Sequence, residues 1–228
     1  MSDAAAPRRA KPLSGRHFAA WLSCPQRAWH ELFSDARLKA PDPGYLVALQ
    51  LEGLAFERSA SAAHFPKAEE IPSRLPDSER HRRTVVAMTR GVPAVFQGCL
   101  TGPDAIGVVD VLELVGTDAA SATGHLYRVG EFKRATTLKT AHVFQVTWYD
   151  DLLRTLQGRS SGDGFVVLGD GTRRNVDLAS SRAAYEATRA RLLALRMGSE
   201  EPGPHLISDC PSCPWRSLCL PRLVAESH

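Results

Sequence analysis

The sequence has no long hydrophobic run and no apolar leader, and each absence excludes a class of protein. The longest apolar stretches, such as 105–109 and 165–168, fall far short of the roughly 20 residues that a membrane span requires. Residues 1–13 mix Ala and Pro with three basic side chains and lack the apolar centre of a secretory signal. We therefore expect no membrane segment and a cytoplasmic location.

The sequence also has little net charge. Its 28 Lys and Arg against 25 Asp and Glu give +3, which does not by itself indicate a nucleic-acid partner. Basic clusters at 80–83 and 173–174 suit contacts to phosphate and suit solvated surfaces equally well. An apolar content of 43% with 23% charged residues excludes extended disorder, collagen-like repeats and coiled coil.

The 228 residues suit one domain of three parts: a helical part over 14–91, a core over 92–200 and a cysteine-rich part over 201–228, after a flexible segment over 1–13. Periodicity predicts a helix from Ser14 that is interrupted at Pro25 and continues to 33, helices over 45–63, 77–91, 140–156 and 181–197, and strands over 92–100, 106–115, 126–134, 165–168 and 173–178. Three prolines predict a loop over 66–76, and no regular period is visible from 201. The sum is an α/β fold with a mixed central sheet of about five strands flanked by helices.

Five cysteines are present, and three of them form a Cys-x2-Cys-x5-Cys cluster at 210, 213 and 219. In a reducing compartment such a cluster indicates a metal site more often than a disulfide. Three thiolates leave a tetrahedral site or a cuboidal cluster one ligand short. Cys24 stands at a helix break, whereas Cys99 lies in an apolar strand typical of a buried core. The expected ligands are therefore Cys24, Cys210, Cys213 and Cys219.

Two metal groups compete for this site. Structural zinc usually takes its ligands as two local pairs, whereas a lone cysteine with a distant triplet suits a 4Fe–4S cluster better. We favour the 4Fe–4S cluster and keep zinc as the alternative. Either group would join segments that lie 186 positions apart (210 − 24) and would contribute folding energy.

A second set of polar residues lies in the predicted strands. Strand alternation places Glu131 and Lys133 on one face and Phe132 in the core. Asp110 stands in an otherwise apolar strand, and because a buried unpaired carboxylate is costly, it belongs at a strand end, in a cleft or on a cation. Two carboxylates can hold Mg²⁺ or Mn²⁺, beside which a lysine orients water and stabilises developing charge. A cross-strand ion pair is the alternative interpretation.

The helix predicted after Lys133 carries two further polar groups. Gln145 and Tyr149 are four residues apart and therefore share one side of that helix. If the helix crosses the end of the sheet, their polar tips reach the same cleft. For Tyr149 a place in the core is the alternative.

Together these residues resemble the RecB-type PD-(D/E)xK nucleases. They are most similar to the branch with an iron–sulfur cluster, which includes the CRISPR-associated RecB-like exonucleases and stand-alone RecB-like nucleases. The features that carry the resemblance are Asp110 after Gly-Val-Val, Gly-Glu-Phe-Lys-Arg at 130–134, Gln145-x3-Tyr149, Cys24-Pro and the terminal cysteine triplet. They occur in the family's order over 18–219.

The resemblance implies a restriction-endonuclease-like core and hydrolysis of DNA phosphodiester bonds with Mg²⁺ or Mn²⁺. It implies an exonuclease on single-stranded ends, in processing of CRISPR spacer precursors or in DNA repair, with a CRISPR integrase complex or a helicase as partner. Asp110 and Glu131 would bind the metal, Lys133 would be the catalytic lysine, and Gln145 and Tyr149 would position the strand. The four cysteines would ligate a structural 4Fe–4S cluster.

The chain departs from the family at one metal ligand. The family supplies a His from an N-terminal helix, often four residues after a Gly, whereas Glu57 holds that place after Gly53 here. A carboxylate suits Mg²⁺, and His64 is a less well placed substitute. The departure motivates a second hypothesis, a catalytically degenerate nuclease fold that binds DNA or a partner as a scaffold.

Overall fold

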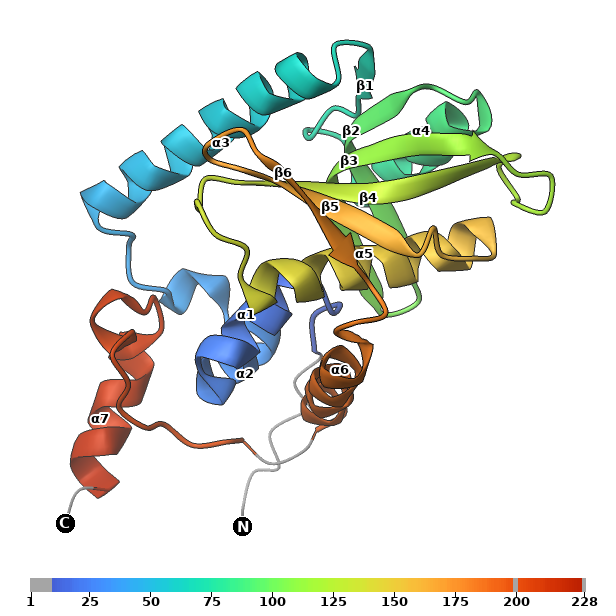
Figure 1. Ribbon diagram of the computed structural model, residues 1–228. Helices are drawn as coiled ribbons and strands as arrows, with labels where there is room; N and C mark the ends of the chain where they lie inside the picture. Colours follow the sequence, from blue (N-terminus) through green and yellow to red (C-terminus); the bar gives the residue numbers. More distant parts are fainter. Residues whose placement is uncertain (1–9, 199–200, 227–228) are drawn as a thin grey trace.

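Six strands form one mixed sheet in which spatial order follows chain order (Figure 1). The computed structural model describes residues 10–198 and 201–226. The strands are β1 (Ala68–Glu70), β2 (Ala94–Gly102), β3 (Ala105–Thr117), β4 (His125–Lys133), β5 (Asp163–Leu168) and β6 (Arg173–Asp177). The pairs β1–β2 and β4–β5 are parallel, and the other three are antiparallel.

Helices make the connections that parallel pairing demands. The described α-helices are α1 (Gly15–Ser23), α2 (Pro25–Phe33), α3 (Gly44–His64), α4 (Asp77–Thr89), α5 (Thr140–Gln157), α6 (Arg182–Arg196) and α7 (Arg216–Glu226), with short 3₁₀ turns at Ala36–Leu38 and Cys210–Ser212. Thus α4 joins β1 to β2, and α5 joins β4 to β5. Within the described part of the chain, no helix combines the length and apolar character needed to cross a bilayer.

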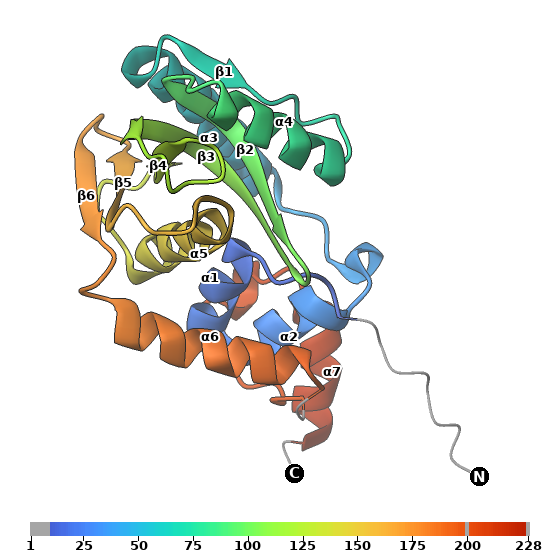
Figure 2. The ribbon, with the colours of Figure 1, turned by 90° about the vertical axis from the view of Figure 1, so that its right-hand side faces the viewer.

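The larger apolar core fills the space on the α5 side of the sheet. Figure 2 shows α5 against the sheet, with α1 and α6 beyond it. Phe18 of α1 joins the layers, because its ring stacks on Tyr185 of α6 at 5.2 Å and lies 5.6 Å from Trp148 of α5. Leu112 and Val129 of the sheet complete this core with no exposed surface.

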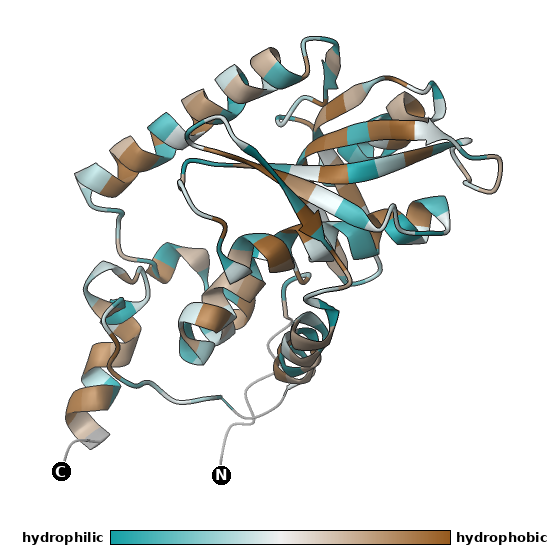
Figure 3. Cartoon of the chain, in the orientation of Figure 1, coloured by the Kyte–Doolittle hydropathy of each residue, from teal (hydrophilic) through white to brown (hydrophobic). Residues whose placement is uncertain are grey.

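A smaller core lies on the opposite face. Phe96, Val111, Phe132 and Phe165 point there, and Ala60 near the end of α3 packs on the same cluster. The first half of α3 is uncovered in the described structure: Leu51 is 62% exposed, and hydrophobic segments recur along this helix in Figure 3. The last turns of α3 are therefore the part that the sheet holds in place.

The strands and helices expected from periodicity are confirmed to within two residues, and two further elements were missed. The sheet has six strands because β1 occupies part of the segment expected as a loop. It is only three residues long and pairs at the sheet edge, where flanking prolines are tolerated. The tail expected to be irregular contains α7, whose internal Pro221 obscures its period.

The expectation of a flexible start falls mainly on residues 1–9, which lie outside the described residues. Residues just after them are packed against the domain. Leu13 is 1% exposed and forms a bridge with Ala105 of β3, and the Lys11 N–H donates to the Leu32 carbonyl at 3.0 Å. The packed chain therefore begins before Ser14, whose own N–H donates to His17 Nδ1 at 2.9 Å at the start of α1.

Candidate functional site

The end of β4 carries the Glu-x-Lys sequence with the expected alternation. Phe132 is buried in the smaller core, whereas Glu131 points to the α5 side and is only 1% exposed. Lys133 Nζ donates to Glu131 Oε1 at 2.9 Å. The strand thus places a buried carboxylate and an ammonium group side by side.

Asp110 lies where β3 and β4 separate. Their backbone register runs to the pair Val111–Gly130 and stops there, and β4 continues alongside β5. The Phe132 N–H, which the β3 backbone no longer reaches, donates to Asp110 Oδ2 at 2.8 Å. Asp110 is 7% exposed, so the two acidic side chains share a buried position at this fork.

Gln145 and Tyr149 of α5 close the other side of the fork. Gln145 Nε2 donates to Glu131 Oε1 at 2.8 Å and to the Tyr149 hydroxyl oxygen at 2.9 Å. Tyr149 is also a core residue, 5% exposed. Tyr149 is therefore both a core residue and a polar group of the site, because its ring is packed while its hydroxyl takes part in the hydrogen bonds with Gln145.

Glu57 faces the same groups from α3. Burial raises its pKa to about 7, and the neighbouring Asp110 carboxylate adds to the rise while Lys133 opposes it. His64, the alternative at the end of α3, is exposed, and its ring lies 6.3 Å from that of Phe65. The structure therefore brings Glu57 toward Asp110 and Lys133, and leaves His64 apart.

The electrostatics of this centre reflect an excess of acidic groups. Burial, and then the proximity of Asp110, raise the pKa of Glu131 well above its usual range. Burial opposes the charge on Lys133, yet Glu131 and Asp110 together raise the pKa of Lys133, so the ammonium form is retained. Three carboxyl groups face one lysine, a balance that an added cation would improve.

The chemistry of the donors fits a divalent cation. Glu131 Oε2 is buried and no N–H or hydroxyl donor reaches it, while the Glu131 and Asp110 carboxyl groups lie within hydrogen-bonding reach of each other, which is costly when both are ionised. Oxygen donors of Asp and Glu are those that Mg²⁺ and Mn²⁺ prefer. Among residues 10–198 and 201–226, no three His, Cys, Asp or Glu side chains lie close enough together to hold a metal ion as they stand.

Gln97 belongs to this centre and was missed in the sequence. In the described chain it is the only residue other than glycine with a positive φ, at 56°. It interrupts β2 between the pairs Phe96–Val111 and Gly98–Val109, which sets it opposite Asp110. Its side chain hydrogen-bonds the Asp110 carboxyl. The available signal was a lone amide in an apolar strand, and the unusual backbone has no local sequence signature.

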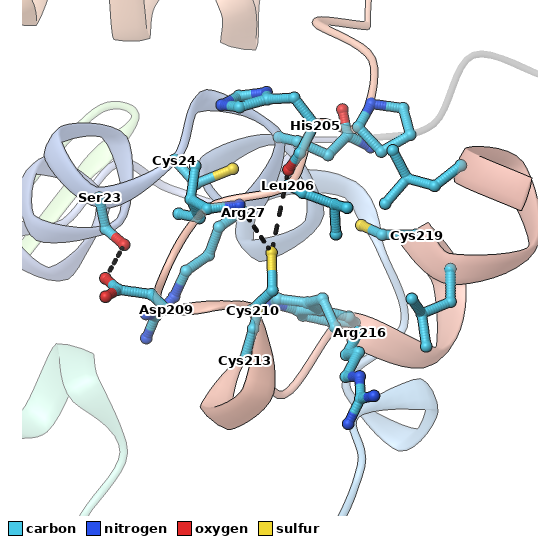
Figure 4. Close-up of a pocket in the computed structure, with 16 residues that line it drawn as sticks. Ser23, Cys24, Arg27, His205, Leu206, Asp209, Cys210, Cys213, Arg216 and Cys219 are labelled. Carbon is cyan, nitrogen blue, oxygen red and sulfur yellow. Dashed lines mark hydrogen bonds between the residues drawn. The ribbon is translucent and has the colours of Figure 1, made fainter. Parts of the chain in front are cut away.

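The four cysteines of the predicted cluster line one cavity, shown in Figure 4. The thiols of Cys24, Cys210 and Cys219 point into it, and Cys213 contributes a fourth part of the wall. Burial raises the pKa of Cys219 to about 11, and the thiols of the other three cysteines add to the rise. Cys99 is buried elsewhere, with its thiol 3.7 Å from the Asp77 carbonyl.

The surroundings of this cavity suit a negatively charged group held by thiolates. The Ile207 N–H donates to Cys210 Sγ at 3.4 Å, and Leu206 and Leu220 cover the space. Arg27 and Arg216 line the cavity as well, so cationic side chains are available to balance thiolate charge. The donors therefore fit an iron–sulfur cluster or a thiolate-bound metal.

The cysteine-rich segment is attached to α2 by polar contacts that the sequence did not reveal. Trp215 is fully buried and donates from Nε1 to Glu31 Oε1 at 2.9 Å. The His30 ring stacks on Trp215 at 5.3 Å, and His30 Nε2 lies 3.6 Å from Cys219 Sγ. A histidine next to a predicted ligand has no distinguishing sequence pattern, because its proximity depends on how two distant segments pack.

No model of a known protein family matches the chain. No curated protein matches it either. The function proposed below therefore rests on the residues and contacts of this chain.

Proposed function

We propose that this chain is a divalent-metal-dependent deoxyribonuclease of the RecB-like type, with a restriction-endonuclease-like core, that hydrolyses phosphodiester bonds at single-stranded DNA ends. One observation carries the proposal: buried Glu131 is joined to Lys133 and Gln145, beside Asp110, where two strands of the sheet separate. An ion pair with a purely structural role does not require a second buried carboxyl group against the first or a carboxylate oxygen that no donor reaches.

Asp110, Glu131 and Glu57 are the residues that would hold the divalent cation. When bound there, the cation would polarise the scissile phosphoryl group and offset the charge that develops on it. Glu131 Oε2, which no donor group reaches in the structure, is the atom best suited to become a ligand.

The protein side chains supply orientation and charge. Lys133 keeps its proton beside Glu131, so its ammonium group can orient the attacking water and stabilise negative charge at the phosphate. Gln145 holds Glu131 Oε1 and the Tyr149 hydroxyl at fixed positions, which limits the rotation of the carboxylate. These roles need a rigid centre, and the contacts between β4 and α5 provide one.

The cysteine cavity serves as a structural site in this proposal. Cys24, Cys210, Cys213 and Cys219 would ligate a 4Fe–4S cluster that fastens the C-terminal segment to α2. Protein purified without oxygen should be brown and contain about four irons per chain. One bound zinc without iron would replace the cluster assignment and leave the nuclease proposal standing.

The decisive experiment is cleavage of end-labelled single-stranded DNA with Mg²⁺ or Mn²⁺ by anaerobically purified protein. The wild type should give products that disappear with chelator, and Lys133→Ala should lose them while still folding, as circular dichroism would show. Lys139→Ala is the matched control, because Lys139 is an exposed lysine at the start of α5. Undiminished cleavage by Lys133→Ala would refute the proposal, and the product ladders would reveal polarity.

Glu57 supports a second candidate, a degenerate nuclease fold that binds DNA without cutting it. The family's imidazole ligand is replaced by a carboxyl group whose pKa of about 7 leaves it partly protonated at neutral pH. DNA binding by the wild type without cleavage under any divalent cation would favour this candidate. Gain of cleavage in Glu57→His would then identify this position as the cause.

A further inference from the structure

A second cavity borders the candidate active centre on the side of α1. It has a volume of about 490 Å³, and Lys11, Arg16, Val108, Gln145 and Tyr149 contribute to its walls. Gln145 also contacts Glu131, and Val108 lies two residues from Asp110 on β3. The cavity and the carboxylate centre are thus on either side of the same Gln145–Tyr149 pair.

Two glycines bring α1 and β3 close to this pair. A Cβ atom on Gly15 would lie 2.9 Å from Gln145 Cγ, and one on Gly107 would lie 2.6 Å from Tyr149 Cδ1. Any larger residue at either position would displace the polar pair or fill the cavity. The close approach keeps the wall between the cavity and the carboxylate centre only one side chain thick.

Neither cation of the cavity forms an ion pair with a carboxylate of the described residues, although Glu31 lies near enough to act on the charges of both. Lys11 Nζ donates to the backbone carbonyls of Glu31 and Ser34, at 3.1 Å and 2.8 Å, and these neutral acceptors leave its charge in place. Arg16 is exposed, and its side chain forms no ion pair or hydrogen bond with any residue the structure describes. The one acidic side chain of the wall, Asp77, lies 3.5 Å from Arg80, which offsets its charge.

We propose that this cavity binds a backbone phosphate of the single-stranded DNA next to the phosphate that is cleaved, with Arg16 as the direct contact and Lys11 as a fixed positive charge. The proposal rests on the nuclease function above for the identity of its ligand. A guanidinium group without a partner, at the rim of a cavity one side chain from the carboxylates, suits a phosphodiester oxygen. The strand would pass from the centre over Gln145 and Tyr149 toward α1.

The test measures DNA binding without cleavage, by fluorescence anisotropy of a labelled oligothymidylate in the presence of chelator. Arg16→Gln should weaken binding several-fold, and the slope of log K against log salt should fall by about 0.7, the value for one lost phosphate contact on a single strand. Arg191→Gln is the matched control, an exposed arginine on α6 that does not line the cavity. Its affinity and slope should equal those of the wild type.

The outcomes separate this site from the nuclease proposal. Equal affinity and slope in Arg16→Gln and the wild type would overturn the phosphate site even if the protein cleaves DNA. Absence of DNA binding by the wild type would overturn it as well. Weaker binding with a reduced slope, in a protein that never cleaves, would support the site and refute the nuclease. If the protein cleaves, Arg16→Gln should raise KM and leave kcat unchanged, because the lost contact would bind the substrate and the transition state equally well.

Discussion

The carboxylate centre and the cysteine cavity differ in what holds them together. In the carboxylate centre, Lys133, Glu131, Gln145 and Tyr149 form a continuous chain of hydrogen bonds at 2.8 to 2.9 Å, between a strand and the helix that follows it. In the cysteine cavity, His30 Nε2 lies 3.6 Å from Cys219 Sγ and links α2 to a segment 189 residues away. The Ile207 N–H reaches Cys210 Sγ at 3.4 Å within the C-terminal segment itself. The first site is built within one strand and the helix that follows it, whereas the second brings together two distant segments, which the proposed cluster would join.

Removal of a thiol from the cysteine cavity should have the largest effect and tests this difference between the two sites most directly. Cys213→Ser should lower Tm by on the order of 10 °C, because in the proposed cluster a lost ligand would remove folding energy supplied by metal binding. Hydrogen exchange should show the C-terminal segment opening first, with α5 still protected. Cys99→Ala provides the comparison, since Cys99 lies outside the cavity. An equal loss of Tm in both variants would contradict a special role for the cavity thiols.

The next largest effect is expected at the protein contact that anchors the same segment. Trp215→Ala should reduce the free energy of unfolding by about 3 to 5 kcal/mol, as removal of a buried Trp side chain does. Trp215→Phe keeps an aromatic ring but loses the bond to Glu31 and part of the packed volume, so a smaller loss of about 1 to 3 kcal/mol is expected. Urea denaturation measures both. A Trp215→Ala protein as stable as the wild type would show that the cluster alone holds the segment.

Acid should destabilise the folded protein through His17 of α1. Burial, followed by the charge of Arg16, lowers the pKa of His17 to about 4. The unfolded chain binds a proton near pH 6.5 and the folded protein does so only near pH 4, so His17 makes unfolding easier as pH falls between these values. The contribution at pH 5 is about 2 kcal/mol.

Urea denaturation at pH 7 and pH 5 checks this effect. His17→Gln keeps an acceptor for the Ser14 N–H and does not titrate, so it should lose less stability between the two pH values than the wild type. The same loss in both proteins would assign the acid sensitivity to other groups.

The smallest effect is expected from substitutions of Gln97, which test whether the carboxylate centre is held in place by the fold. Gln97→Ala and Gln97→Gly both remove the hydrogen bond to Asp110, but only glycine accepts a φ of 56° without strain. Gln97→Gly should therefore be more stable than Gln97→Ala by about 1 kcal/mol. Calorimetric titration with Mn²⁺ should show the same weakened binding in both. Wild-type affinity in either variant would remove Gln97 from the centre.

Local periodicity predicted most of the fold because the strands pair with their neighbours in sequence. The alternation in β4 was enough to place Glu131 and Phe132 on opposite sides, and the helix break before Pro25 was enough to choose Cys24 over Cys99 as a cavity residue. β1 was missed because three residues between prolines are too short for a period. Contacts between distant segments, such as that of His30 with Cys219, cannot be predicted from the periodicity of residues near each other in the sequence.

The wall of the cysteine cavity also sets an order of events during synthesis. Cys24 leaves the ribosome 195 residues before Cys219 (219 − 24), and the cavity exists only when both are present. At about 5 to 20 residues per second, the Cys24 thiol waits roughly 10 to 40 s for its partners. The sheet between them can pair during that interval, so the cysteine cavity can be completed last, on strands that are already paired.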